Sequence, residues 1–373
     1  MGPTAESISH FVHGVITTYF LTWAVFIWNL RHQSRMMYML FLTMSYIGFC
    51  AVKEMIFLVD GVSDIFFWSG LCLTLDIVVV PLVVNFFFEV ISPGWATKGK
   101  VLVQMGLQAL FIPIFAIFPS QMVLDVALYS TYLYCVVSIL IMCLMLSRHR
   151  KYIRDNYSYT EHIDVAWAVN FVVVMFVCVT LYVIASSTDT WTSRSVFQAI
   201  LMAAWIYLNQ LARKHSVVNV PSSVMFAFPL IKNQNVKSED VCVAGDVSSD
   251  SLEMYAGMAA QLEACMSIKK LYLNPKLTLH DVCSAIGTNR TYLSDYLNNV
   301  LKTTFYDYVN ELRIKTACEI MDAMTPQTRR PIIEIAEISG FNSISTFNRA
   351  FVKLMSTTPG QYVSRKKIMT EVR

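Results

Sequence analysis

Ionisable side chains inside apolar stretches are the first candidates for chemistry in this sequence. Asp76 lies about ten residues into a long apolar run, ~15 Å along the axis of a helix. Carboxylates in such surroundings are rare and commonly belong to binding or sensing sites. The other interpretation is an ion pair that holds neighbouring helices together, and the sequence leaves both open. For Lys53 and Glu54 the structural interpretation is favoured, because both can snorkel towards a membrane surface.

Motifs for enzymatic chemistry are missing from the sequence. It has no HExxH, no GxSxG and no phosphate-binding GxxxxGK followed by Ser or Thr. Its nine cysteines form no CxxC pair and no His/Cys cluster with metal spacing, and His10 and His13 are weak candidates for a metal site. We therefore expect a protein that is not an enzyme and that uses no cofactor or metal.

The composition separates two parts of the chain. Hydrophobic residues make up 55% of the 373 residues and charged residues 15%, whereas a soluble domain usually has about 25% charged residues. The apolar residues lie almost entirely before Lys214. Residues 251–373 carry 15 Lys and Arg against 11 Asp and Glu, so the small basic surplus of the whole chain, 29 against 26, belongs to this C-terminal part.

Apolar segments of membrane-spanning length recur through the first part. A helix needs roughly 20 residues to cross the ~30 Å hydrocarbon core of a bilayer, where the backbone must satisfy its own hydrogen bonds. The segments predict a seven-helix transmembrane bundle, since a soluble bundle could hardly bury so many apolar runs. Pro81 is expected to kink the third helix. The predicted spans are residues 11–30, 36–58, 66–90, 101–118, 123–146, 165–185 and 196–212.

Basic residues alternate from one side of these segments to the other. Loops one, three and five and the end of the last span are basic, whereas loops two and four have no Lys or Arg and loop six has only Arg194. The positive-inside rule then places the N-terminus outside and the C-terminus in the cytoplasm. The basic residues on the cytoplasmic side are Arg31, Arg35, Lys98, Lys100, Arg148, Arg150, Lys151, Arg154, Arg213 and Lys214.

A polar connector joins the two parts. Residues 215–250 contain Pro221 and Pro229 and end in a Ser- and Asp-rich stretch, which predicts a partly disordered linker. A helix then begins near Ser251, with apolar residues at spacings of three and four. This stripe is either a short coiled-coil seam for a homodimer or, as we favour for residues 259–272, the inward face of the first helix of the next domain. Its members are Leu252, Tyr255, Ala259, Leu262 and Met266.

The C-terminal part contains the same helical pattern twice. Thr278 can cap a helix that turns at Gly287, and Asn289 can cap a second helix directly after it. After a longer predicted helix over residues 305–324, a glycine supplies another turn and Ser343 another cap. Two helices joined by a short glycine turn form a helix-turn-helix. The sequence therefore predicts two such motifs linked by one long helix.

Residues 271–362 resemble the tandem helix-turn-helix domain of the AraC/XylS family. The most specific part of the resemblance is the pattern IxEIAxxxGFxSxSxFNRxF. Members of this family place two recognition helices, held apart by the linking helix, in successive segments of the DNA major groove. The resemblance says nothing about the apolar part. The residues that carry the pattern include Glu334, Ile335, Ala336, Gly340, Phe341, Ser343, Ser345, Phe347, Asn348, Arg349 and Phe351.

The resemblance also assigns residues to DNA. Arg and Asn side chains can read guanine and adenine bidentately, so the second recognition helix suits base readout better than the first. Helix starts offer backbone N–H groups to phosphate. The basic run 365–367 is either a further phosphate contact or a solvated end. The implied base-reading residues are Thr291, Ser294 and Asp295 in the first helix and Ile344, Ser345, Asn348 and Arg349 in the second. The implied phosphate contacts are Thr288, Asn289, Arg290, Ser343 and Lys353.

Three positions depart from the family pattern. Asp295 stands where the family usually has Arg, and Lys302 and Ser356 stand where glycines usually end the recognition helices. A residue other than glycine in a left-handed cap costs about 1 kcal/mol. Either these caps have another geometry here, or the domain is somewhat less rigid.

These features together predict an all-α protein: a seven-span domain over residues 1–214, a cytoplasmic linker over 215–250 and an AraC-type domain with a preceding helix over 251–373. We expect a sequence-specific transcription regulator in the inner membrane that couples a signal to promoter binding in the cytoplasm. Its expected partners are double-stranded DNA, membrane lipids, a second copy of the chain and an unknown small-molecule or membrane signal, for which Asp76 is the candidate sensing residue. The alternative is a transporter or membrane enzyme with a regulatory DNA-binding tail.

Overall fold

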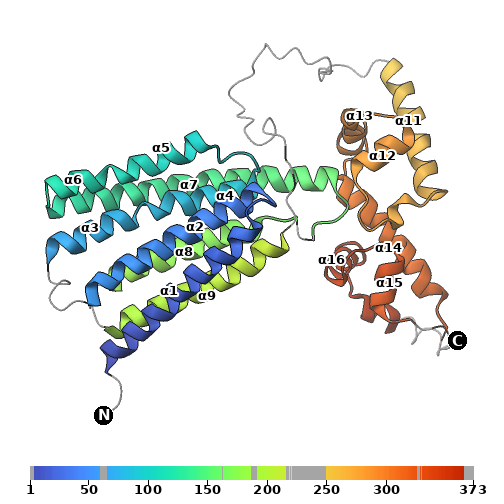
Figure 1. Cartoon of the computed structure of the whole chain (residues 1–373). Helices are drawn as coiled ribbons and strands as arrows, with labels where there is room; N and C mark the ends of the chain where they lie inside the picture. The colour runs from blue at the N-terminus through green and yellow to red at the C-terminus, as the bar shows by residue number, and fades with distance from the viewer. Residues whose placement is uncertain are drawn as a thin grey trace. The chain divides into compact units, whose positions relative to one another are not determined.

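The structure, a computed structural model, describes most of the chain. The described residues are 4–58, 65–161, 163–185, 191–215, 249–325 and 330–364, with the single positions 218, 220 and 328. They divide into two compact units, Met1–His149 with Val165–Phe226 and Arg150–Asp164 with Ala227–Arg373. The described parts of both units are helical and hold no strand, which confirms the predicted all-α class (Figure 1).

The first unit is built from long apolar helices. Six stretches of the described chain are long and apolar enough to cross a membrane, and Ala166–Val177 is a shorter apolar helix within the predicted span 165–185. The count of seven spans therefore stays a prediction. The helices are α1 (Ala5–Leu30), α2 (Arg35–Lys53) with the 3-10 turn η1 (Glu54–Leu58), α3 (Phe66–Asp76), α4 (Val79–Ile91), α5 (Lys98–Ala109), α6 (Phe111–Ile117), α7 (Gln121–Asn156), α8 (Ala166–Ala185) and α9 (Trp191–Lys214).

Prolines interrupt two of these stretches. Pro81 has no N–H to donate to the carbonyl of Ile77 four residues earlier, and that carbonyl accepts instead from the Val80 N–H at 3.2 Å. The kink predicted at Pro81 is thus a break between α3 and α4. Pro113 follows a similar break at Leu110, between α5 and α6.

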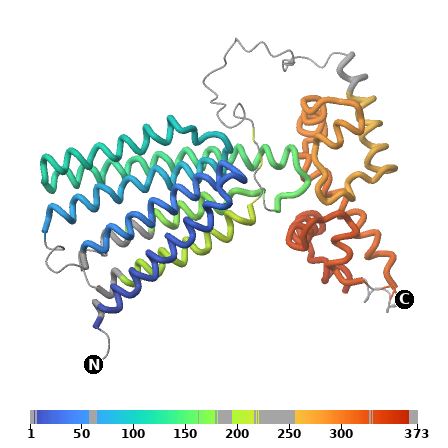
Figure 2. Tube along the Cα trace, viewed as in Figure 1, coloured from blue at the N-terminus to red at the C-terminus, as the bar shows by residue number. Residues whose placement is uncertain are grey.

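Apolar side chains of the first unit point both inward and outward. α1 packs against α2 and α9, and α2 packs against α4, side by side in Figures 1 and 2. Phe20, Leu40 and Phe86 are fully buried between these helices. On α5 and α7, Leu102 is 67% exposed and Leu133 is 66% exposed. Water would disfavour such a surface, whereas lipid would favour it.

Asp76, at the end of α3, is part of an ion pair. Its Oδ2 lies 2.8 Å from the Lys53 ammonium, which also donates to the Cys72 carbonyl at 3.2 Å. The Lys53 side chain is only 9% exposed, so it turns inward. The expectation that it snorkels towards a membrane surface is wrong. The structure therefore supports the ion-pair interpretation of Asp76, and a sensing role stays a prediction.

The second unit contains the tandem helix-turn-helix pattern. α12 and α13 form the first motif, α15 and α16 form the second, and α14 links them, as predicted (Figure 1). The unit also includes Arg150–Asp164, which begins within the last turns of α7. The elements of this unit after residue 248 are α11 (Ser249–Ser267), the 3-10 turn η3 (Leu271–Leu273), α12 (Leu279–Ile286), α13 (Arg290–Asp295), the π-helical turn η4 (Tyr296–Val300), α14 (Phe305–Ala323), α15 (Ile332–Ile338) and α16 (Ile344–Met355).

Each helix-turn-helix has its own hydrophobic core. The first core includes Val282 and Leu293, and the second includes Phe347 and Phe351. Burying one such side chain contributes ~1.5–3 kcal/mol. α14 supplies residues to both cores, so it joins the two motifs.

The helix α11 belongs to the first core. Leu262 and Met266 of the stripe are buried there beside Met258, which confirms that this part of the stripe is the inward face of a domain helix. A dimer role for the first turns of α11 stays a prediction. The predicted linker 215–250 lies, apart from a few positions, outside the described residues, as does the basic run 365–367.

Candidate nucleic-acid interface

Local sequence determines the first helix-turn-helix. The Thr278 hydroxyl accepts from the Asp281 N–H at 3.2 Å, and the Asp281 carboxylate accepts from the Thr278 N–H at 2.9 Å, which is a capping box. Gly287 ends α12 with a left-handed φ of 68°, which favours glycine. The Asn289 side chain then accepts from the Tyr292 N–H at 2.9 Å and begins α13. The predicted caps and turn are confirmed.

The second motif follows the same plan. The Ser343 hydroxyl accepts from the Thr346 N–H at 3.2 Å and begins α16, as predicted. The turn before it requires Gly340, whose φ is 86°. A Cβ at Gly340 would lie 2.7 Å from the Cα of Leu273, so no larger residue fits.

Both recognition helices end in left-handed caps. Lys302 has a φ of 53° and Ser356 a φ of 52°. The usual left-handed cap geometry is therefore kept without glycine. The alternative that these caps have another geometry is wrong. Each residue bears a conformational cost of about 1 kcal/mol.

One face of α16 carries most of the predicted base-reading residues. Ser345, Asn348 and Arg349 are exposed, whereas Phe347 and Phe351 point into the core. Residues three and four apart share one face of a helix. Ser345 therefore shares a face with both Asn348 and Arg349, while Ile344 is half-buried at the start of the helix.

The face of α13 is smaller and more covered. Of its predicted base readers Thr291 is exposed, whereas Ser294 and Asp295 are half-buried. The Asp295 carboxylate accepts a hydrogen bond from the Tyr255 hydroxyl of α11 and another from the Asn299 amide. The structure therefore connects Asp295 to its own domain, a partner that the sequence analysis did not anticipate.

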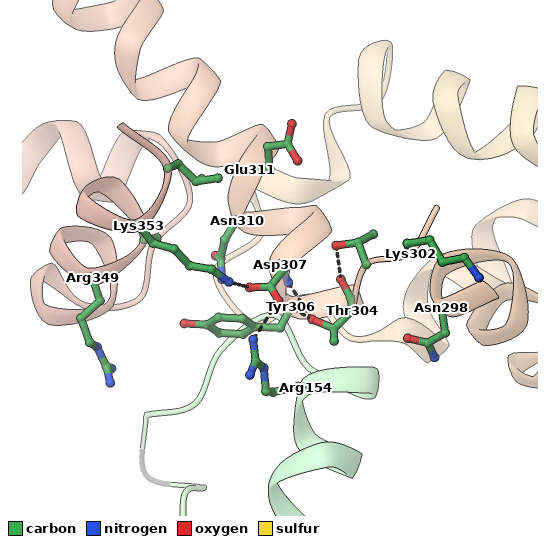
Figure 3. Close-up of a pocket in the computed structure, with 13 residues that line it drawn as sticks. Arg154, Asn298, Lys302, Thr304, Tyr306, Asp307, Asn310, Glu311, Arg349 and Lys353 are labelled. Atoms are coloured by element: carbon green, nitrogen blue, oxygen red, sulfur yellow. Dashed lines mark hydrogen bonds and ion pairs between the residues drawn. The ribbon is translucent and has the colours of Figure 1, made fainter. Parts of the chain in front are cut away.

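A hollow of about 590 Å³ lies between the two motifs. Its lining includes two of the predicted DNA contacts, Arg349 and Lys353. Figure 3 shows Arg349 and Lys353 on one side of the hollow and Lys302 on the other. Arg154 is a fourth lining cation, and the lining acids are Asp307 and Glu311. Lys302, Arg349 and Lys353, the three cations that the tandem helix-turn-helix itself supplies, outnumber the two acids, which suits a phosphate backbone.

Asp307 lies at the centre of the polar contacts in this hollow. Its carboxylate accepts from the Lys353 ammonium at 2.7 Å, from the Arg154 guanidinium at 2.8 Å and from the Thr304 hydroxyl at 3.0 Å (Figure 3). Burial by itself would raise the pKa of Asp307, but these hydrogen bonds and cations outweigh burial and hold the pKa below its usual value. In this structure Lys353 is therefore occupied by a carboxylate where DNA would offer a phosphate.

Comparisons with known proteins agree with this geometry. Residues 282–365 match the helix-turn-helix domain family. The melibiose operon regulatory protein of Escherichia coli strain K12 is 30% identical over 86 residues, which are 23% of this chain and 27% of that protein. The RCS-specific HTH-type transcriptional activator RclR of the same strain is 27% identical over 121 residues, or 28% of this chain and 41% of that protein.

The C-terminal part of this chain is an AraC-type helix-turn-helix domain. The chain spans well under half the length of these two relatives, and the AraC-type domain is where the family match lies. No solved structure matches the chain.

A buried arginine holds the AraC-type domain together. Arg313 is 1% exposed, and its guanidinium donates to the carbonyls of Tyr272 and Asn274, each at 2.7 Å. Burial lowers the pKa of Arg313 to about 10, so it stays charged at neutral pH. The sequence analysis missed this residue. Its position in the sequence nevertheless indicates burial, because Arg313 lies four residues from Val309 and from Ala317, in the apolar stripe of α14.

The sequence analysis also missed the contacts of Arg150–Asp164 with the AraC-type domain. The segment was predicted only as a basic loop. Its partners in the domain lie 119 to 185 residues away along the chain, so no local pattern marks them. Tyr152, Arg154, Ser158 and Glu161 make these contacts.

Proposed function

We propose that this protein is a membrane-bound, sequence-specific DNA-binding regulator of transcription. The observation that carries the proposal is the exposed surface of α16, which presents Asn348 and Arg349, the latter lining the hollow with Lys302 and Lys353. Arg can donate to guanine O6 and N7, and Asn can pair with adenine N6 and N7. Ser343 and Ser345 add contacts at the start of the helix, where phosphate is favoured.

The first motif has the more auxiliary role in this proposal. Thr288, Asn289 and Arg290 stand at the start of α13, where they contact phosphate and position the domain. Thr291 and Ser294 contribute weaker base contacts. Two motifs joined by one rigid helix would then bind successive major-groove segments.

Membrane attachment is supported by the first unit. Six of its helical stretches have the length and composition of membrane spans, and several large apolar side chains of α5 and α7 are exposed. The alternating basic loops favour an arrangement with the AraC-type domain in the cytoplasm, where DNA is accessible. The two relatives are a regulatory protein and a transcriptional activator, which supports regulation of transcription as the output.

DNA selection tests the proposed function directly. The full chain, purified in lipid nanodiscs, is incubated with a randomised duplex library, and bound duplexes are enriched and sequenced. We expect a reproducible sequence motif whose binding weakens steeply with salt, because phosphate contacts release counterions. Absence of both enrichment and salt-dependent binding would contradict the proposal.

A second experiment separates regulation from the alternative of a transporter or membrane enzyme. The full chain is reconstituted in vesicles, and solute uptake is compared with that of the Asp76→Asn variant. A flux that this substitution abolishes would favour the alternative and would give the Lys53–Asp76 pair a transport role. If the protein is a regulator, deletion of its gene should change transcript levels and leave solute uptake unchanged.

A further inference from the structure

The segment Arg150–Asp164 is docked on the AraC-type domain. Tyr157 forms an isolated antiparallel bridge with Thr278, the residue that caps α12. The Ser158 N–H donates to the Leu277 carbonyl at 3.1 Å, and the Ser158 hydroxyl donates to the same carbonyl at 2.7 Å. Ser158 is fully buried, so this is a built contact and not a surface encounter.

Arg313 reaches the same residue from the domain. Its guanidinium donates to the Ser158 carbonyl and to the Ser158 hydroxyl oxygen, each at 3.0 Å. Without Ser158 it would keep its bonds to Tyr272, Asn274 and Asn310. The domain can therefore release the segment while most of the donors of Arg313 keep a protein partner and water replaces Ser158.

Glu161 places a negative charge at the start of the second recognition helix. The Ser343 hydroxyl donates to Glu161 Oε1 at 2.8 Å, and the Thr346 hydroxyl donates to the same oxygen. Burial by itself would raise the pKa of Glu161, but the hydrogen bonds from Thr346 and Ser343 outweigh it and leave the pKa below its usual value. The group is thus an anion at neutral pH, and it lies against two hydroxyls at the N-terminal end of α16, an end of a helix that favours phosphate.

Two other side chains of the segment contact Arg290 and the carboxylate that holds Lys353, two further predicted phosphate contacts. The guanidinium carbon of Arg290, at the start of α13, lies 4.8 Å from the centre of the Tyr152 ring, a cation–π contact. Arg154 binds Asp307, the same carboxylate that holds Lys353. The segment therefore touches the start of both recognition helices and the hollow between them.

We propose that Arg150–Asp164 is a built-in competitor of DNA, so that its docking on the AraC-type domain and DNA binding exclude each other. The proposal rests on the proposed function, because it assumes that DNA uses the faces of α13 and α16. Glu161 stands in for a DNA phosphate at α16. Arg150–Asp164 comprises the last turns of α7 and the connection towards α8, so a signal that displaces these helices would release the domain for DNA.

DNA binding by a Glu161→Ala variant tests the competition. The full chain in nanodiscs is titrated with a mixed-sequence DNA duplex at low salt, which reports phosphate contacts without knowledge of the promoter. We expect Glu161→Ala to bind about tenfold more tightly than the unmodified protein, because DNA no longer displaces a charged hydrogen-bonded group. Ser343 still caps α16 through the Thr346 N–H, so the variant keeps its helix.

The matched control is Asp164→Asn. Asp164 is a carboxylate of the same segment and lies 3.6 Å from Arg150, which is itself part of the segment. Its substitution removes the same negative charge without touching α16, so it should bind the duplex like the unmodified protein. Equal tightening in both variants would overturn the proposal, since it would reflect net charge alone.

Hydrogen exchange at the Ser158 amide supplies a measurement that needs no substitution. This N–H is protected by the Leu277 carbonyl in the docked state. A saturating duplex should increase its exchange in the unmodified protein, and unchanged protection with DNA bound would overturn the proposal, as would equal or weaker binding by Glu161→Ala. If no variant binds the duplex at any salt concentration, the proposed function itself fails and the competition falls with it.

Discussion

The two recognition helices differ in how much of each is available to DNA. α13 has 6 residues before it passes into a π-helical turn, whereas α16 runs for 12 residues. In α13 the predicted base reader Asp295 is bonded to Tyr255 of α11. In α16 both Asn348 and Arg349 are exposed.

This difference indicates a division of labour between the motifs. The first motif is anchored by α11 and offers small or occupied side chains, so it suits positioning on the phosphate backbone. The second carries the side chains that distinguish bases. The Glu161 contact at α16 fits this division, because blocking the helix that reads sequence is the more effective way to prevent specific binding.

Substitution of Arg313 should have the largest effect, because this residue is shared by the two motifs. Arg313→Ala removes a buried cation and leaves several carbonyls without their donor, so we expect a loss of about 3 kcal/mol in the stability of the domain. Arg313→Lys should restore little, since an ammonium cannot reproduce the guanidinium fork. The measurement is urea-dependent labelling of Cys283, which is buried in the first core.

Lys315→Ala is the control on the same helix. Lys315 is exposed and pairs with Glu311 four residues away, an arrangement that contributes only ~0.3–0.5 kcal/mol. A similar stability in Arg313→Ala and Lys315→Ala would show that the two motifs hold together without the buried arginine.

Substitutions at Arg349 and Thr291 compare the two recognition helices directly. Arg349→Ala should weaken binding to the selected DNA by ~1–3 kcal/mol and relax the preference at one base position. Thr291→Ala should cost less than ~1 kcal/mol, because α13 contributes less to base readout. Competition binding with single-base variants of the selected duplex measures both.

Lys353→Ala serves as the phosphate-contact control. It should weaken all sequences alike and reduce the salt slope by about one. An Arg349→Ala variant that changed only the salt slope would remove the base-reading role from α16, and a larger loss in Thr291→Ala would reverse the comparison.

Sequence reasoning was most successful where structure depends on neighbouring residues. Thr278, Asn289 and Ser343 cap their helices as predicted, because in each the side-chain oxygen accepts from an N–H only three residues later. Pro81 interrupts its helix for an equally local reason. Apolar runs of sufficient length likewise predicted the long helices of the first unit.

Contacts between distant parts of the chain could not be predicted in this way. Glu161 reaches Thr346 across 185 residues, and Arg154 reaches Asp307 across 153 residues. Asp295 was predicted to face DNA by its position in the motif, and its bond to Tyr255 depends on how α11 packs. Such pairs become visible only when the packing of the helices is known.

Asp295 and Tyr255 test whether the first motif is anchored or reads bases. If Asp295 serves mainly to hold α11, Asp295→Asn and Tyr255→Phe should each lower domain stability by about 1 kcal/mol, and the double variant should lose no more than either single one. The base preference in a DNA selection should remain as in the unmodified protein. A changed preference at one base position in Asp295→Asn would instead identify this residue as a base reader. The role of α13 would then resemble that of α16.

The smallest effect is expected at the end of α16, where Ser356 replaces the usual glycine. Its φ of 52° is strained for a residue with a Cβ, and its N–H already donates to the Val352 carbonyl at 3.0 Å. Ser356→Gly should relieve the strain, and because glycine also gains freedom in the unfolded chain, the net gain in stability should be ~0.5–1 kcal/mol.

Lys302→Gly should give a similar gain at the end of the first recognition helix, because Lys302 has a φ of 53°. However, Lys302 lines the cationic hollow, so this variant should also weaken DNA binding, whereas Ser356→Gly should not. Urea-dependent labelling of Cys283, paired with the duplex titration, separates the two effects. A loss of stability in Ser356→Gly would mean that the serine side chain makes a compensating contact, and the two helix ends would no longer be equivalent.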